Sequence, residues 1–392
     1  MILVSACQEK KVVLSGLQHI SLSLKTDQKL FLSEIADSIE IVSFEQTEES
    51  DLATVMKIIY HKGRYYLLNS IGYASKSVQV FDNEGKFLFK LDKRGQGPNE
   101  WVELNDFTIN ERTDELILLG LPRKMLVYDL DGNFKKVVKL EKTYSTICAD
   151  ISNQYYLTSE YCTELKPYWL TLVNDTSCHE FCKVEEGDFI RMNHYTFSND
   201  FAICNADVYA SYPFCDTIFN ITKGVMIPEF YLDYCGQNLP VSSIFKVGYD
   251  MKQIEHEKQK YSGRFRKSAF AFSNKYCYVS SQDGNQHAFV SLYSRHSEKV
   301  ISGCRLVDDV FFPNNTLKFT SSNIFSYTIK DDYLFCLFRP SWLMRGYETY
   351  QKKSSKEKWD MFSKHYPKMV EVCSQLDEES NPVLLRIKLK DF

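Results

Sequence analysis

The chain has 392 residues, 27 of them Phe and 25 Tyr, and a formal net charge of −4. This charge argues against a nucleic-acid-binding protein, because such proteins carry basic patches. No run of about 18 apolar residues occurs, so no segment is predicted to span a membrane. The length alone favours two domains, but a repeat architecture can enlarge a single core around a ring.

Residues 1–30 are predicted to be a truncated lipoprotein signal and a tether. Small residues precede Cys7 in the segment VSAC, as in a lipobox, whose cysteine is lipidated after cleavage. Only the three residues MIL stand before this segment, whereas a signal peptide has about 7–15 apolar residues there. Residues 8–30 are polar and turn-prone, as expected of a tether. The alternative is a frayed terminus that holds an ordinary cysteine.

A β-hairpin is predicted at residues 78–91, where VQVF precedes the turn DNEG and FLFKL follows it. Alternation of apolar and polar residues indicates a half-buried strand, and a glycine in the turn supplies a positive φ. The segment VYDLDGNF at 127–134 repeats VFDNEGKF at 80–87, an offset of 47 residues. Gly85 and Gly132 are therefore both expected to have a positive φ.

The hairpin pattern continues along the chain at further steps of 46 residues, which is typical of propeller blades. Six short apolar runs that follow polar turns are predicted to be the second strands of the blades, buried on both faces. These runs are KGRYYLLN (62–69), TDELILLG (113–120), SNQYYLT (152–158), NADVYAS (205–211), SNKYCYVS (274–281) and KDDYLFCL (330–337). Together they predict an all-β fold, a six-bladed β-propeller over residues 31–392.

Two segments break the repeat and are predicted to be helical insertions, at about 243–262 and 341–380. The final strand, Val383 to Leu389, is expected to close the ring against residues 38–45, because closure removes free sheet edges. In the second insertion, apolar residues recur every three or four positions, which indicates a helix face packed on the propeller rim or, alternatively, a groove for a partner helix. These residues are Trp359, Phe362, Tyr366, Met369, Cys373 and Leu376.

Several segments together resemble the Bacteroides-type six-bladed β-propeller lipoproteins, relatives of NHL-repeat propellers. The most specific are RGQGPNEW at 94–101 and SNPVLLRIKLKDF at 380–392. Others are EIVSFEQT, VYDLDGNF, YPFCDTIFNITKGVMIPEFYLDYCGQNLP and RLVDD. The resemblance covers about residues 30–392. It implies an exported, lipid-anchored protein of the cell envelope with no assigned activity.

The loop at 94–101 is the most distinctive candidate site. Two glycines and a proline predict a tight reversal, across which Arg94 is expected to pair with Glu100. Alternatively, the loop lines the central pocket and offers Trp101 for stacking and Arg94 for a carboxylate. It is not a phosphate loop, because the strand–loop–helix context and the Lys-Thr pair are missing.

Further candidates stand near the predicted starts of inner strands, which lie closest to the channel. Asn105 and Asp106 are expected to be pocket-lining or turn residues. Four cations could recognise an anion, although isolated charges commonly face solvent. They are Arg191, His194, Arg264 and Arg266.

The cysteines give no metal site. The segment Cys178-His179-x-x-Cys182 lacks a second pair of ligands and is predicted to be a surface turn. Twelve cysteines in this length are too few for a disulfide scaffold, and lipidation of Cys7 would leave an odd number.

Two classes of function remain. The first is a non-catalytic propeller that binds a glycan, a peptide or a protein at the channel face and meets the membrane only through its lipid. The second is a propeller enzyme, a lactonase, another hydrolase or a lyase, with Ca²⁺ held by carboxylates such as Asp106 and Asp150. Neither His-Glu-x-x-His nor Gly-x-Ser-x-Gly occurs in the sequence, which favours binding without a cofactor.

Overall fold

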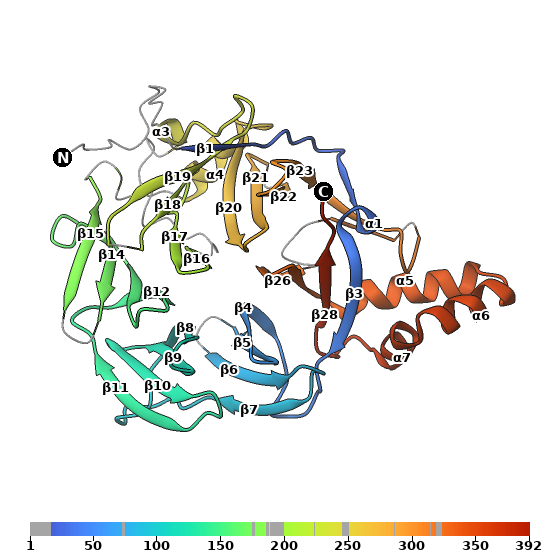
Figure 1. Cartoon of the computed structure of the whole chain (residues 1–392), viewed down its shortest axis with the longest axis horizontal. Coiled ribbons are helices and arrows are strands. Elements are labelled where there is room, and N and C mark those ends of the chain that lie inside the picture. Colours follow the sequence, from blue (N-terminus) through green and yellow to red (C-terminus); the bar gives the residue numbers. More distant parts are fainter. Residues whose placement is uncertain are drawn as a thin grey trace.

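The computed structural model describes residues 17–72, 75–174, 177–185, 188, 200–222, 224–244, 251–285, 287–313, 315–318 and 324–392. Six sheets stand around a central channel like the blades of a propeller (Figure 1). The prediction of a six-bladed β-propeller is therefore confirmed.

Each blade is antiparallel, and its strands follow the sequence from the channel to the rim, except that β3 forms the rim of the last blade. In blades 1 to 3 the strands are β4 (Thr54–His61), β5 (Arg64–Ile71), β6 (Ser75–Asp82), β7 (Phe87–Leu91); β8 (Leu104–Asn110), β9 (Glu115–Gly120), β10 (Lys124–Asp129), β11 (Phe134–Lys139); and β12 (Tyr144–Ala149), β13 (Tyr155–Ser159), β14 (Tyr168–Val173), β15 (Cys178–Lys183). In blades 4 to 6 they are β16 (Phe201–Cys204), β17 (Asp207–Ala210), β18 (Thr217–Asn220), β19 (Ile227–Asp233); β20 (Phe265–Phe272), β21 (Tyr276–Asp283), β22 (Ala288–Ser294), β23 (Val300–Gly303); and β26 (Ile324–Lys330), β27 (Tyr333–Phe338), β28 (Val383–Leu389), β3 (Ala36–Ser43).

The second strand of every blade coincides with one of the six apolar runs predicted from the sequence. In β9, for example, Ile117 and Leu118 are both fully buried although they point to opposite faces. A strand that is sandwiched between neighbouring blades must be apolar on both faces, which explains the continuous runs.

The two repeated turns have the expected conformation. Gly85 has a φ of 89° and Gly132 a φ of 83°, as predicted. In the first turn, Asp82 Oδ1 accepts hydrogen bonds from the backbone N–H of Glu84 and of Lys86, both at 2.9 Å. The aspartate thus holds the reversal while the glycine supplies the left-handed backbone.

Replacing Gly132 with Val should lower the free energy of unfolding by more than about 1 kcal/mol, because a β-branched residue is strained at positive φ. A Cβ at this position would also lie 2.8 Å from Cε2 of Phe89. The matched control is Gly236→Val, since Gly236 has a φ of 78° but nothing within 4 Å of an added Cβ. Urea unfolding of both variants measures the difference, and equal losses would show that the Phe89 contact is unimportant.

The ring closes as the sequence predicts. β28 pairs with β27 on one side and with β3 on the other, so the last strand lies between the penultimate strand and an N-terminal one. Asn381 reinforces this seam, since its Oδ1 accepts from the N–H of Leu52 at 2.8 Å and its Nδ2 donates to Glu45 O at 3.0 Å.

The predicted boundary between tether and propeller at residue 30 is wrong. β1 (Gln18–Ser21) pairs in parallel with β19 at the rim of blade 4, and β2 (Lys29–Phe31) pairs in parallel with β24 (Arg305–Asp308). A third strand, β25 (Asn315–Lys318), completes this small extra sheet, and the short helix α1 (Leu32–Ile35) follows β2. The folded structure thus includes residues 17–31, while Cys7 lies outside the described residues.

Apart from the short α1, the helices in the described residues occur in the two predicted insertions. The first contains α3 (Val241–Ile244) and α4 (Met251–Gln259), and the second contains α5 (Pro340–Lys353), α6 (Lys356–His365) and α7 (Pro367–Gln375), which project from the ring (Figure 1). Phe362, Met369 and Cys373 are buried in a core cluster that includes blade 6, so the apolar stripe packs on the propeller. No helix in the described residues is long and apolar enough to cross a bilayer.

Candidate functional site

The strand directions define two faces of the ring. The upper face carries the start of each inner strand, the connections between blades and the turns between second and third strands. The lower face carries the two other turns of each blade. The loop 94–101, the Asn105 region and Arg264 all belong to the upper face, where the channel opens.

The loop at 94–101 is held by Glu100 and not by the predicted pair with Arg94. Glu100 Oε2 accepts from the N–H of Gly97 at 2.8 Å. A Cβ on Gly95 would lie 1.9 Å from the same oxygen, so a larger residue there would displace the carboxylate from this position. Arg94 instead donates from Nε to Asp92 Oδ1 at 3.2 Å. The motif is therefore a self-supporting turn.

Trp101 does not face the channel, so the hypothesis that it stacks on a ligand is wrong. Its exposed fraction is 0%, and it packs in the cluster between blades 1 and 2 with Leu104 and Leu126. The tryptophan of the sequence motif is therefore part of the hydrophobic core between these two blades. Arg94 is half exposed at the rim end of the same loop, away from the inner strand that starts at Leu104.

The channel contains a polar junction that the sequence only partly revealed. Asp106 lies on the inner strand β8, near the channel as predicted, but its carboxylate is already paired with Lys57 on β4. Lys57 Nζ lies 3.0 Å from both carboxylate oxygens of Asp106 and donates to Phe107 O at 2.8 Å. Asp106 Oδ2 also accepts from the N–H of Ile147 on β12 at 2.9 Å. The junction therefore links three inner strands, and Lys57 was missed because a lone lysine in an apolar strand carries no signal.

Asn105 is likewise engaged within the protein. Its side-chain Nδ2 donates to the backbone carbonyl of Tyr144 at 2.7 Å, and the backbone carbonyl of Asn105 accepts from Lys76 Nζ at 3.4 Å. Arg191 and His194 lie outside the described residues. Arg264 is exposed and donates to Gly236 O, which makes it a link to the preceding turn.

Arg266 belongs to a buried charged cluster between blade 5 and α4, and therefore does not face solvent. Its guanidinium carbon lies 4.5 Å from the centre of the Phe214 ring, over which Lys258 Nζ lies at 5.4 Å. Arg266 also donates to Gln282 Oε1 at 2.7 Å. These contacts help to attach the first helical insertion to the ring.

Lys267 is the unusual member of this cluster. Lys267 stands directly before a β-bulge in the inner strand β20. The equivalent positions before the bulges of β4 and β8 are taken by Val55 and Leu104. All three side chains are buried. Burial lowers the pKa of Lys267 and, in the neighbouring turn, raises the pKa of the Asp216 carboxyl to about 6.

The raised pKa of Asp216 predicts a pH-dependent contribution to stability. Because the folded state binds the proton more tightly than the unfolded chain, this group lowers stability as the pH rises from about 4 to about 6. Asp216→Asn removes the titration, so the variant should gain up to about 3 kcal/mol relative to the wild type across that range. Melting curves at several pH values test this, with Glu84→Gln, in an exposed turn, as control; parallel curves for Asp216→Asn and wild type would contradict it.

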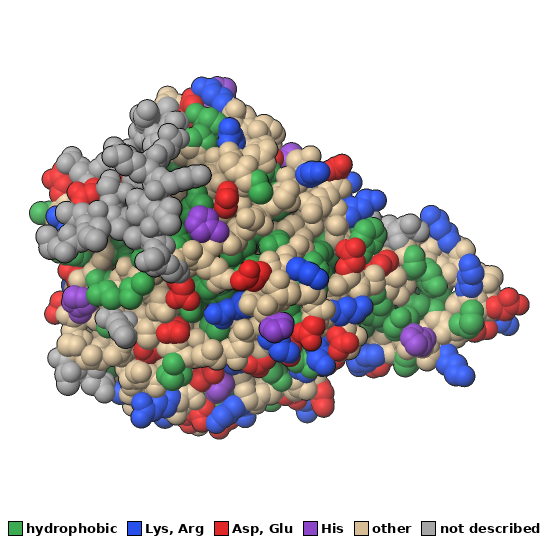
Figure 2. Space-filling model, turned by 45° about the horizontal axis from the view of Figure 1, so that its top comes forward, with side chains coloured by type: hydrophobic (Ala, Val, Ile, Leu, Met, Phe, Trp, Pro, Cys, Tyr) green, Lys and Arg blue, Asp and Glu red, His purple; other side chains and the backbone are tan. Residues whose placement is uncertain are grey.

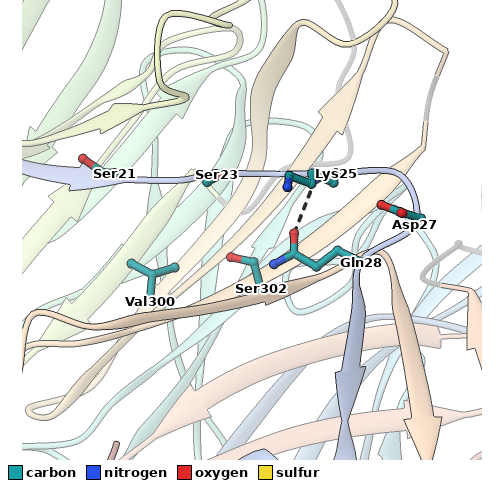
Figure 3. A pocket seen from close by; sticks show the side chains of 7 residues that line it. All are labelled: Ser21, Ser23, Lys25, Asp27, Gln28, Val300 and Ser302. Atoms are coloured by element: carbon teal, nitrogen blue, oxygen red, sulfur yellow. Dashed lines mark hydrogen bonds between the residues drawn. The ribbon is translucent and has the colours of Figure 1, made fainter.

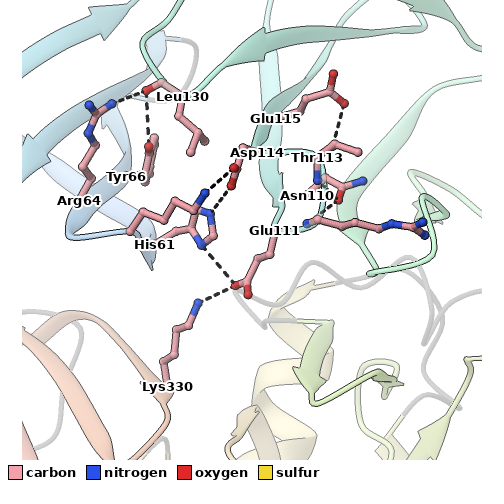
Figure 4. Close-up of polar contacts among 12 residues, drawn as sticks. His61, Arg64, Tyr66, Asn110, Glu111, Thr113, Asp114, Glu115, Leu130 and Lys330 are labelled. Carbon is pink, nitrogen blue, oxygen red and sulfur yellow. Dashed lines mark hydrogen bonds and ion pairs between the residues drawn. The ribbon is translucent and has the colours of Figure 1, made fainter.

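The lower face carries a chain of polar contacts across three blades (Figure 4). His61 at the end of β4 lies 3.1 Å from Asp114 Oδ1 through Nε2 and 3.9 Å from Glu111 Oε1 through Nδ1. Lys330 at the end of β26 reaches the same Glu111 oxygen at 2.6 Å. This chain fastens the lower ends of neighbouring inner strands.

A cavity of about 440 Å³ lies beside the N-terminal segment, where this crosses β23 of blade 5 (Figure 3). Polar side chains line it, among them Ser21, Asp27, Gln28 and Ser302. Gln28 Oε1 accepts from the N–H of Lys25, which shapes the bend above the cavity. The cavity is far in the fold from the channel strands and contains none of the predicted site residues.

Metal ligation is not supported by the residues that the structure describes. No group of three or more His, Cys, Asp or Glu side chains there is placed to hold a metal ion. Cys178 and Cys182 belong to strand β15 at the rim of blade 3, so the segment is an edge strand and not the predicted turn. Asp150, a possible calcium ligand, accepts from the N–H of Ser152 at 2.8 Å and of Gln154 at 2.9 Å.

The turn between β13 and β14 presents apolar side chains on the upper face. Leu165 is 94% exposed and Tyr161 is 60% exposed. The turn is ordered by reciprocal hydrogen bonds between the backbones of Thr163 and Lys166, at 3.1 and 3.0 Å, and Cys162 is buried beneath it. An apolar residue within the polar run CTELKP was the signal that could have identified this turn.

Comparisons with known proteins agree with the fold. A family described as "Domain of unknown function (DUF4934)" matches residues 17–388. A Bacteroides fragilis protein that is thought to be exported is 15% identical, with a TM-score of 0.70 over 96% of this chain and 99% of that chain. A member of the DUF4221 family from Bacteroides vulgatus is 10% identical, with a TM-score of 0.53 over 92% and 99% of the two chains. No curated protein matches.

At these identities the solved structures are informative about the fold alone. The family match includes every blade and the N-terminal strands β1 and β2. The chain therefore belongs to the DUF4934 family, whose function is unknown.

Proposed function

We propose that this protein is a non-catalytic binding propeller, exported and anchored by a lipid on Cys7, that recognises a glycan, a peptide or a protein on its upper face. The observation that carries the proposal is the β13–β14 turn. Leu165 is the most exposed large apolar side chain in the described part of the chain. Exposed apolar groups on an ordered loop of a rigid scaffold are typical of recognition surfaces.

The turn has the features of a preformed contact. Tyr161 offers an aromatic face and a hydroxyl, a combination that suits sugars and peptides alike. Since backbone hydrogen bonds already order the turn, little conformational entropy would be lost on binding. Two further apolar side chains of the same face, Ile71 in blade 1 and Val102 before blade 2, are 50% and 56% exposed.

The test is a glycan and peptide array probed with the purified protein, followed by affinity measurements on the variant Tyr161→Ala/Leu165→Ser. Lost contacts of this kind cost about 1–3 kcal/mol, so the affinity should fall roughly ten- to a hundredfold. The control is Val225→Ser, on the lower face and 50% exposed. Equal affinities of all three proteins would remove the turn from the proposal, and hydrolysis of the ligand would favour a propeller enzyme.

The lipid anchor has its own test. Cells that express the native gene are fed a labelled fatty acid, and the label should appear on the wild-type protein but not on Cys7→Ser. The likeness to a protein thought to be exported supports this part of the proposal. Label retained on Cys7→Ser would show that Cys7 is not the lipidated residue.

A further inference from the structure

The projecting helices end in a basic tip. Residues 352–368, the last turn of α5, all of α6 and the start of α7, contain six lysines against Glu357 and Asp360, which gives a net charge of +4. The whole chain has a charge of −4, so the remaining residues sum to −8. The lysines are Lys352, Lys353, Lys356, Lys358, Lys364 and Lys368. The excess of positive charge is confined to this tip, because residues 340–351 and 369–380 of the same projection carry a net charge of −4.

Most of these lysines are available to a partner. Lys352 pairs with Glu348 at 3.6 Å and Lys368 with Glu371 at 3.2 Å. The four others are exposed, and within the described residues no ion pair engages them. A cluster of unpaired ammonium groups on one projection attracts anions more than isolated surface charges do.

Apolar and aromatic side chains stand among the lysines. Met361 is 66% exposed on α6. Trp359 is partly exposed and lies against Tyr347 and Phe362, with ring centres 5.4 and 5.6 Å apart. In Figure 2 apolar surface and basic groups occur together on the projection. Trp, Met and Lys in this combination are typical of helices that lie at a membrane interface.

We propose that this tip binds an anionic lipid surface. Each lysine close to an anionic surface strengthens binding about fivefold. Screening limits the interaction to about 8 Å at physiological salt, so the charges of the tip itself act on the membrane. Residues 352–368 carry +4, of which Glu348 and Glu371 offset two through their pairs with Lys352 and Lys368. The body would be repelled on close approach, which orients the protein tip-first. The contact is separate from the lipid on Cys7 and from the β13–β14 turn.

The experiment measures co-sedimentation of full-length Cys7→Ser protein, which has no lipid, with vesicles of phosphatidylcholine alone or mixed with phosphatidylglycerol. The test variant is Lys356→Glu/Lys358→Glu. Both positions are in the first turn of α6, where Glu favours the helix dipole and can form a capping box with Ser355, so the fold should be kept. The control is Lys136→Glu/Lys139→Glu on β11, which changes the net charge equally.

The wild type and the control should bind the anionic vesicles, and raising the salt from ~0.05 M to ~0.5 M should release them. The test variant should bind roughly twenty-five-fold more weakly or not at all. Met361→Ser should weaken binding without altering the salt dependence. Equal binding by test and control variants, equal binding to neutral vesicles, or binding to heparin or an acidic peptide in place of vesicles would each overturn the proposal.

Discussion

Replacing Trp101 with Ala is expected to lower the free energy of unfolding by about 3–5 kcal/mol, because it leaves a large cavity between two blades. The side chain is fully buried and packs beside Leu104 and Gly120. This loss is a substantial part of the stability of an ordinary domain. Equilibrium unfolding in urea measures it.

Trp101→Phe provides the matched control. The indole Nε1 of Trp101 has no hydrogen-bond partner within the described residues, so phenylalanine loses volume but no polar contact. Its cost should be well below that of alanine. If Trp101→Ala melted like the wild type, the residue would not be part of the core, and a role in ligand stacking would become credible again.

Asp106→Ala is expected to have an effect of similar size, about 3 kcal/mol, because it leaves the ammonium of Lys57 in a mostly buried place without its carboxylate. The side chains of Lys57 and Asp106 are 25% and 7% exposed. The substitution also removes the acceptor for the N–H of Ile147. Urea unfolding again gives the measurement.

The double variant Lys57→Met/Asp106→Asn separates the two causes. It removes both charges and keeps an amide oxygen for the N–H of Ile147, so it should recover most of the stability lost in Asp106→Ala. A double variant as unstable as Asp106→Ala would show that shape, and not the unpaired ammonium, governs this junction.

The fold could be predicted because its signals are local. The turns at Gly85 and Gly132 need an aspartate, a positive φ and flanking alternation, all of which stand within a few residues. The second strands are apolar on both faces because blades cover them, and Val383 to Leu389 reads as a strand without a neighbour in sequence. The six apolar runs give the number of blades, and the spacing of 46–47 residues marks the repeat in the first four.

The errors arose where the outcome depends on distant contacts. Trp101 packs between the blades beside Gly120 at the end of β9, where an added Cβ would lie 2.9 Å from the Cβ of the tryptophan. The sequence around Trp101 does not reveal this contact. Strands β1 and β2 are short, and each pairs with an edge strand that is far away in the sequence, β19 and β24. The alternation of buried isoleucine and leucine with exposed serine over residues 20–24 was a strand signal that the tether prediction overlooked, but it could not identify the partner strand.

The candidate site residues were also predicted well where local signals were enough and poorly where distant contacts decided. Asp106 was placed near the channel correctly, but its partner Lys57 lies 49 positions away, and nothing in either sequence neighbourhood links them. Arg266 was expected to face a ligand but is buried over Phe214, because the inserted helix α4 covers it. A charged residue is normally expected to be exposed, so its burial cannot be predicted when an inserted helix covers it.

The central claim is that the polar interior fastens the blades together while recognition belongs to the exposed upper turn. The most direct test uses two variants and one ligand identified on the array. The affinity of each variant for this ligand and the melting temperature of each variant are measured. Tyr161→Ala/Leu165→Ser should lose affinity roughly ten- to a hundredfold and melt like the wild type. Lys57→Met/Asp106→Asn should keep the affinity and melt at a lower temperature. An unchanged affinity for the turn variant together with a lost affinity for the channel variant would contradict the account.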